Sequence, residues 1–377
     1  MQNLDRTLRV AIAQGDTNGI GYELILKTLA DPEILELFTP VVYGSPSAVY
    51  AYAEVLGINF NCVTVSSARE IREGKVNVVN ICASDSLLEI GVENDASKEA
   101  ARESILAASY DCIAGLVDVV VMAPSSKSEV EAIVAGLCAS AEDAGEQFDN
   151  SSICPLHLLH GRFGYTVSLA GNASADQAKQ AISVEAIVAC GHQMHKALYR
   201  DLNMNVPRIA IVGLDGVPVK EAVAKLANES IQAFGPYDAA EFYENEEYKE
   251  FDGIITMNNA QFGQTYVNEY GDSGIRVIIG LPIVATSVIA GPSYAIAGNG
   301  IADESSFRDA VFTAMSIYRN RFYYDQPLKN PLQKMYHERR EDGEKVRFAV
   351  KKKDPASASA PAGKEAKEET KEATEEK

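Results

Sequence analysis

Two turns within the first 130 residues carry side chains that could bind an anion. Residues 15–21, with Asp16 among them, follow a short apolar run and precede a helical pattern. Free N–H groups at a helix N-terminus favour a phosphate or a carboxylate, although a helix cap without ligand gives the same pattern. Residues 123–127 end another apolar run, and Lys127 there suits a phosphate or a carboxylate unless it is simply solvated.

A third stretch, residues 274–303, contains the densest set of small residues. Its β-branched run at 275–279 is typical of a buried strand, and the Gly-Leu-Pro sequence at 280–282 stops it. Small residues and a second glycine turn follow, and then a helical pattern begins at Glu304. This order indicates a ligand site at the carboxyl end of a strand, or a tight connection with no ligand.

Histidine and cysteine offer little metal chemistry. The histidine pairs 157/160 and 192/195 have a spacing that could share a metal, but no carboxylate partner is evident from the sequence. The six cysteines show no CxxC spacing, so we expect reduced thiols in a cytoplasmic protein.

The elements that must position these residues alternate along the chain. We expect strands at residues 9–13, 41–45, 76–81, 118–122, 165–169, 208–213, 253–257 and 275–279. We expect helices at residues 22–29, 47–56, 99–112, 128–150, 175–200 (as one helix or two), 220–234 and 304–320. This alternation predicts an α/β fold with a parallel sheet and right-handed crossovers.

Composition limits the possible partners. The chain has 377 residues and a formal net charge of −19, which disfavours nucleic acid and anionic membranes. No apolar run is long enough to span a bilayer, and the N-terminus lacks the apolar core of a signal peptide, so we expect a cytoplasmic protein. Residues 351–377 have the low hydrophobicity and mixed charge typical of disorder.

The glycine, proline and hydroxyl pattern of the third stretch resembles that of a known family. The matching residues are Gly280, Leu281, Pro282, Thr286, Ser287, Gly291, Ala297, Gly298, Gly300, Ala302 and Asp303. They resemble the PdxA-like 4-hydroxythreonine-4-phosphate dehydrogenases of vitamin B6 biosynthesis, and the likeness continues over residues 8–320.

The resemblance implies two α/β/α domains around a cleft, an architecture similar to that of isocitrate and isopropylmalate dehydrogenases. One domain would hold residues 1–125 plus 286–325, and the other, with the dimerisation surface, residues 126–285; a C-terminal extension (326–350) and the charged tail follow. It also implies a homodimer, a small-molecule ligand and NAD. The cofactor-binding residues would be Gly291, Gly298, Asn299 and Gly300.

The metal residues of the resembled family are replaced. Its three histidines fall at Asn172, in the shortened loop 214–217, and at Asn259; only the glutamine of its third motif is kept, as Gln261. An amide oxygen is a neutral ligand that suits hard cations rather than an imidazole-type site, so we expect no divalent metal.

The substrate-binding residues are replaced as well. The family's lysine, asparagine and arginine fall at Val267, Arg276 and Ala285. The residues left to bind a substrate or anion are Asp16, Lys127, Asn172, Asn259, Gln261 and Arg276, and no catalytic residue can be named.

Three functions stay open on the sequence. The resemblance implies an NAD-dependent 4-hydroxythreonine-4-phosphate dehydrogenase, an oxidoreductase of pyridoxal phosphate biosynthesis. The replaced residues favour loss or alteration of that activity. They fit either an inactive paralogue with a binding or regulatory role, or a dehydrogenase for a different substrate.

Overall fold

The structure is a computed structural model that describes residues 6–81, 88–125, 129–144, 155–161, 163–262 and 274–329. Residues 6–329 belong to one compact unit. The tail for which the sequence predicts disorder lies outside the described residues. The division into domains at residues 125 and 286 stays a prediction.

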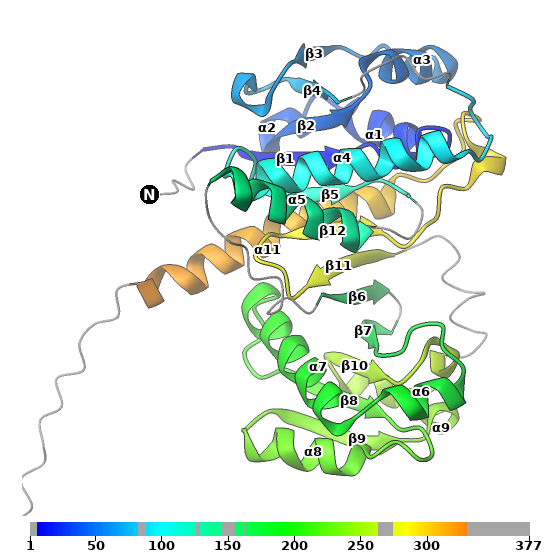
Figure 1. Cartoon of the computed structure of the whole chain (residues 1–377), viewed down its shortest axis with the longest axis vertical. Coiled ribbons are helices and arrows are strands. Elements are labelled where there is room, and N and C mark those ends of the chain that lie inside the picture. Colours follow the sequence, from blue (N-terminus) through cyan, green and yellow to red (C-terminus); the bar gives the residue numbers. More distant parts are fainter. Residues whose placement is uncertain are drawn as a thin grey trace, which may run out of the picture. The chain divides into compact units, whose positions relative to one another are not determined.

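The described strands form one twelve-stranded sheet in the order β3-β4-β2-β1-β5-β12-β11-β6-β7-β10-β8-β9 (Figure 1). Their bounds are β1 (Leu8–Ala13), β2 (Phe38–Gly44), β3 (Cys62–Val65), β4 (Val76–Asn80), β5 (Val119–Met122), β6 (Leu156–Gly161), β7 (Gly164–Ser168), β8 (Arg208–Val212), β9 (Gln232–Tyr237), β10 (Gly253–Thr256), β11 (Ile275–Ile279) and β12 (Ala285–Val288).

The α/β class is confirmed, but the expected parallel sheet is correct only in part, because the sheet is mixed. Strand β11 runs antiparallel to both β12 and β6, and β6 runs antiparallel to β7. Only residues 280–284 join β11 to β12, and a connection this short cannot make the crossover that a parallel pair requires. Gly280 has a φ of 85°, which permits the sharp reversal there.

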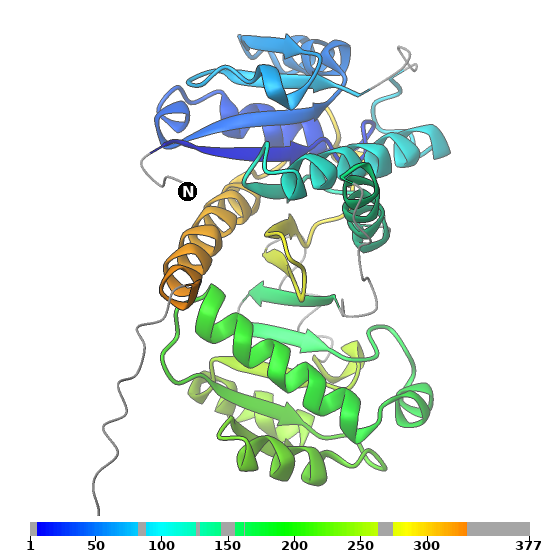
Figure 2. The same ribbon diagram turned by 60° about the vertical axis from the view of Figure 1, so that its left-hand side comes forward.

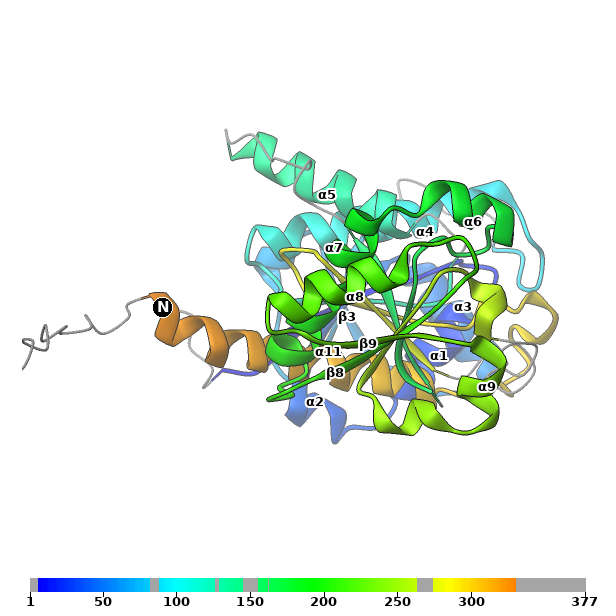
Figure 3. The same ribbon diagram turned by 90° about the horizontal axis from the view of Figure 1, so that it is seen from below.

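The helices begin largely where the sequence predicts them. They are α1 (Gly21–Leu29), α2 (Ile34–Leu37), α3 (Pro46–Leu56), α4 (Asp95–Ile113), α5 (Glu129–Asp143), α6 (Ala175–Ala181), α7 (Val184–Lys196), α8 (Val219–Asn228), α9 (Ala239–Glu244) and α11 (Ser305–Lys329). Figure 2 shows α4 and α5 packed side by side, and Figure 3 shows α7 beside α8.

Two helical predictions are settled by local chemistry. Residues 175–200 form two helices because Ile182 is extended and the Ser183 side chain caps α7 by accepting from the Ala186 N–H. The helix expected over residues 220–234 ends early, at Asn228, and the chain continues as strand β9. Ser230 has a φ of 65°, which turns the chain out of the helix.

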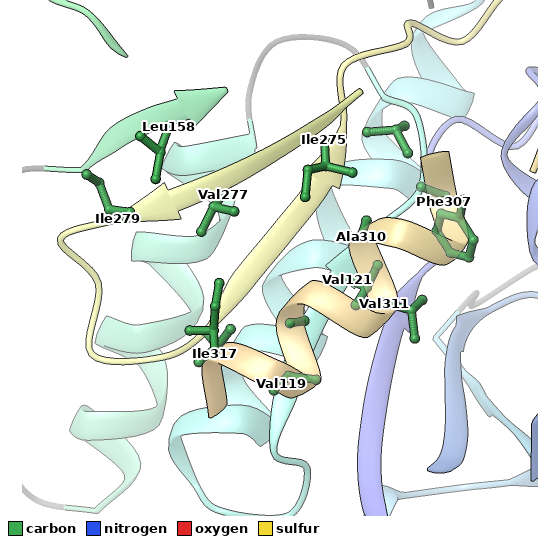
Figure 4. Close-up of a cluster of buried hydrophobic side chains, with 14 of the residues drawn as sticks. Val119, Val121, Leu158, Ile275, Val277, Ile279, Phe307, Ala310, Val311 and Ile317 are labelled. Carbon is green, nitrogen blue, oxygen red and sulfur yellow. The ribbon is translucent and has the colours of Figure 1, made fainter. Parts of the chain in front are cut away.

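The predicted apolar stripe of the helix near residue 310 is confirmed. Phe307, Val311 and Ile317 of α11 are buried against strands β5, β11 and β12 (Figure 4). Each of these side chains, once fully buried, contributes on the order of 1.5–3 kcal/mol relative to exposure. This helix therefore fixes the two strands that lie within the third stretch, β11 and β12.

A buried ion pair joins α11 to the π-helical turn η3 (Ala197–Asp201). The Arg321 guanidinium donates to both carboxylate oxygens of Asp201, from Nε at 2.8 Å and from Nη2 at 2.7 Å. Its Nη1 donates to the carbonyl oxygen of Ile283 at 3.0 Å. One side chain therefore ties three segments that are far apart in sequence.

The described cysteines, Cys62, Cys112, Cys138 and Cys190, are free thiols, as expected. None of the helices formed by the described residues is both long and apolar enough to cross a membrane.

Candidate functional site

The two asparagines that replace family histidines lie against one another. Strands β7 and β10 are parallel neighbours, so the loops at their carboxyl ends meet. The Asn259 backbone N–H donates to the Gly171 carbonyl oxygen at 2.7 Å, and Asn259 Nδ2 donates to Asn172 Oδ1 at 2.7 Å. Each of the two amides therefore has a partner within the chain, and their assignment to the family's metal positions stays a prediction.

Gln261 holds the same loops together. Its Oε1 accepts from the Met257 N–H at 2.6 Å, and its Nε2 donates to the Gly213 carbonyl oxygen at 2.6 Å. Gln261 therefore closes the end of β10 and fastens it to the end of β8. Both ends of the side chain are used by backbone, so this residue positions the loops.

In the third loop, residues 214–217, Val217 lies where the resemblance implies a histidine, and Asp215 is the one carboxylate. Residues 214–217 form a turn in which the Val217 N–H donates to the Leu214 carbonyl oxygen at 2.9 Å. Nowhere in the described residues do three His, Cys, Asp or Glu side chains gather closely enough to hold an ion. Two mutually bonded amides and an apolar side chain do not fit the imidazole-type metal of the resembled family.

A cavity of about 380 Å³ lies beside this loop, lined by residues 213–220 and 236–238. Asp215 and Asp238 contribute the carboxylates of its lining. Asp238 Oδ1 accepts from the Ala240 and Glu241 N–H groups and so caps α9. The cavity thus brings one carboxylate, Asp215, that is not committed to a helix cap.

The histidine pairs are placed in two different environments. His157 and His160 lie on β6, where burial and the nearby Arg276 charge lower the pKa of His157 to about 4. Burial also lowers the pKa of His160, which stacks on Tyr165. The expectation that no carboxylate accompanies these pairs is wrong for His192, whose Nε2 lies 2.7 Å from Glu229 Oε2 on the surface.

Asp16, predicted to help bind an anion, is fully buried and accepts hydrogen bonds from the chain itself. The Tyr294 hydroxyl donates to its Oδ2 at 2.8 Å, and the Asn18 N–H donates to its Oδ1 at 3.0 Å. The carboxylate thereby joins the first glycine-rich turn to the third stretch. Burial and Asp16 together raise the pKa of Tyr294, which keeps that hydroxyl a donor.

The glycines of the first turn are explained by packing. A Cβ on Gly19 would lie 2.5 Å from the Pro292 carbonyl oxygen, and one on Gly15 would collide with the Pro124 carbonyl oxygen. The Ile20 N–H also donates to Pro292, at 2.9 Å. The space that a phosphate would need at these two glycines is filled by neighbouring backbone, which favours the helix-cap interpretation.

The residues predicted to bind a cofactor form part of the third stretch. Gly298 and Gly300 have φ values of 75° and 73°, and the Gly300 carbonyl oxygen accepts from Lys27 Nζ at 2.8 Å. A Cβ on Gly298 would meet Ile90 at 3.0 Å, whereas one on Gly291 would meet nothing within 4 Å. The Asn299 N–H donates to the Ile296 carbonyl oxygen at 3.2 Å, and the role of all four residues in cofactor binding stays a prediction.

Arg276, the last predicted anion-binding residue, has an acidic partner that the sequence did not reveal. Its Nη1 donates to Glu129 Oε2 at 2.8 Å. The same carboxylate oxygen accepts from Ser287 Oγ at 3.3 Å. The two partners are 147 residues apart, so no local pattern could have found the pair. Lys127 and Val267 lie outside the described residues.

Comparison with known proteins gives this fold and site a family. The model of the family described as "Pyridoxal phosphate biosynthetic protein PdxA" matches residues 36–314. A 4-hydroxythreonine-4-phosphate dehydrogenase of Bacteroides thetaiotaomicron is 31% identical, over 91% of this chain and 98% of that protein. Another of that name, from Trichlorobacter lovleyi, is 25% identical over 83% of this chain and 98% of its own length.

The solved structure of a 4-hydroxythreonine-4-phosphate dehydrogenase from Klebsiella pneumoniae has the same fold. It superposes with a TM-score of 0.64 at 20% identity, covering 84% of this chain and 99% of that one. The two proteins therefore share one α/β fold. The chain belongs to the PdxA family of pyridoxal phosphate biosynthetic proteins.

Proposed function

We propose that this chain is a PdxA-family protein that has lost the metal-dependent oxidation of 4-hydroxythreonine 4-phosphate and takes a different small ligand in the cleft. The hydrogen bond between Asn172 and Asn259 is the observation that carries the proposal. It joins two neutral amides at the positions where the resemblance implies two metal ligands. A Lewis acid contributes several kcal/mol to such a reaction, and these residues cannot supply one.

Three further contacts support an altered site. Arg276 is paired with Glu129, Asp16 with Tyr294, and Gln261 with the backbone of two loops. A cationic clamp for a phosphorylated substrate would contribute several charge-assisted hydrogen bonds. These side chains instead make their bonds within the protein.

A metal-binding measurement tests the proposal. The purified wild-type protein should hold no stoichiometric zinc or magnesium by elemental analysis after dialysis, and calorimetric titration with each ion should detect no tight site. One tightly bound metal per chain, lost on Asn172→Ala or Asn259→Ala, would contradict the proposal. Lys179→Ala, a surface change on α6, serves as the matched control, because it should not alter metal content.

The second candidate function is the family activity itself, NAD-dependent oxidation of 4-hydroxythreonine 4-phosphate. The observation in its favour is the 31% identity to the Bacteroides thetaiotaomicron dehydrogenase over nearly the whole length of that protein. The two candidates differ in whether NADH forms from this substrate. We further propose that NAD, if it is retained, contacts the loop at Gly298 and Gly300, and that the protein is a homodimer in the cytoplasm.

A further inference from the structure

The pairing of Arg276 with Glu129 bears on the class of ligand that the cleft accepts. Arg276 lies on β11 opposite Ser287 of β12, and Ser287 lies opposite Met122 at the end of β5. Glu129 is the first residue of α5, the helix that follows β5. The guanidinium and the carboxylate therefore meet at the carboxyl ends of two parallel strands, where α/β proteins present ligand sites.

The carboxylate is the more buried partner. Its side chain is 6% exposed, while that of Arg276 is 24% exposed. Besides the arginine, it accepts from Ser287 Oγ at 3.3 Å and from Ser125 Oγ at 3.3 Å. Three donors from three different segments therefore surround this carboxylate.

Among the described ion pairs, Arg276 is the cation that pairs with this carboxylate. His157, whose position on β6 is opposite Ile278, is the nearby titratable group, and its lowered pKa keeps it neutral near pH 7. The arginine and the carboxylate therefore cancel one another's charge.

We propose that Glu129 is a built-in counter-ion that sets the charge selectivity of the cleft. Its carboxylate satisfies Arg276, so that the site accepts a ligand with no phosphate at the end facing this arginine. The inference deepens the proposed function and rests on it, since it names the ligand class that replaces the phosphorylated substrate.

The physical reason is competition for one guanidinium. A phosphate that bound Arg276 would have to displace a carboxylate already fixed by the fold, and would leave that carboxylate buried without its cation. Neutralising Glu129 removes the competitor but keeps the shape of the side chain. The fold then presents an unpaired guanidinium, which binds inorganic phosphate well.

The test uses inorganic phosphate as the probe on the full-length protein, with chloride at equal ionic strength as the reference. In Glu129→Gln, phosphate should bind at least about tenfold more tightly than in wild type, because one charge-assisted hydrogen bond is worth that much in affinity. Binding is read from the melting temperature and from the Nε–Hε NMR signal of Arg276. Glu129→Gln combined with Arg276→Gln should abolish the gain, which assigns it to this arginine and not to another cation.

Glu131→Gln is the matched control. Glu131 lies in the same first turn of α5 and is exposed, and the change removes the same charge without contacting Arg276. It should leave phosphate binding at the wild-type level. An equal gain in this variant would mean that net charge, not the ion pair, governs anion binding.

The proposal is overturned if phosphate shifts the Arg276 signal of the wild-type protein with an affinity close to that of Glu129→Gln. It is also overturned if folded Glu129→Gln gains nothing. The wild-type measurement decides the matter alone should the variant not fold. Failure of the proposed function would be seen in a different experiment, as formation of NADH from 4-hydroxythreonine 4-phosphate. The two failures can therefore be distinguished.

Discussion

Replacing Arg321 by alanine should destabilise the protein more than any surface change of charge. The side chains of Arg321 and Asp201 are 10% and 6% exposed, and their two hydrogen bonds are 2.8 and 2.7 Å long. Removal of the arginine takes both close hydrogen bonds from a buried carboxylate and leaves it one more distant cation, Arg200, whose Nε lies 3.9 Å from Oδ1. This loss costs about 3–5 kcal/mol. The carbonyl oxygen of Ile283 loses its donor in the same step.

The expected change in melting temperature follows from this loss of unfolding free energy and from the size of the compact unit. Unfolding entropy is about 2.1 cal/mol/K per residue, so a unit of about 330 residues has an unfolding entropy of roughly 0.7 kcal/mol/K. The melting temperature of Arg321→Ala should therefore fall by about 4–7 °C in a calorimetric or fluorescence-detected scan.

Two comparisons sharpen this test. Arg102→Ala removes the exposed pair with Glu99 on α4, and its melting temperature should stay within about 1 °C of wild type. Arg321→Leu with Asp201→Leu should recover part of the loss, because no unpaired charge is left. A melting temperature for Arg321→Ala equal to that of Arg102→Ala would refute the assignment of Arg321 as a buried anchor.

Two further predictions follow from the site. Between its lowered pKa of about 4 and the ordinary value of 6.5, His157 binds fewer protons in the folded state than in the unfolded state. Its contribution to the free energy of unfolding is therefore complete above pH 6.5 and is lost as the pH falls toward 4. His157→Gln should flatten the pH dependence of urea unfolding in this window, and an unchanged slope would contradict the burial of a neutral imidazole. The double variant Asn172→His, Asn259→His should take up zinc weakly and still form no NADH, since Arg276 remains paired with Glu129; normal turnover in that variant would show that the histidines alone were missing.

Local patterns in the sequence predicted most of the helices and strands, because these elements depend on residues that are close together in the chain. The apolar stripe of Phe307, Val311 and Ile317 and the cap at Ser183 are of this kind. The direction of β11 and the existence of β12 could not be read in the same way. Small residues such as Ala285 and Ser287 have weak strand propensity, and pairing with β5 is what makes them a strand.

The candidate site shows the same division. The positions of Asn172 and Asn259 followed from alignment with a family pattern, and the structure brings the two side chains together. The partners of Arg276 and Asp16 did not follow, because Glu129 and Tyr294 are 147 and 278 residues away from them in the chain. Contacts of this range depend on how strands are ordered, and the order was not available from the sequence.

The most direct test of the central claim is the rate of NADH formation from 4-hydroxythreonine 4-phosphate with NAD and a divalent metal, measured in parallel on this protein and on the Bacteroides thetaiotaomicron relative. The account predicts a rate at least about a thousandfold lower for this protein, since loss of the Lewis acid removes several kcal/mol and each 1.36 kcal/mol is a factor of ten. A rate within tenfold of the relative would contradict the claim that the metal-dependent oxidation has been lost.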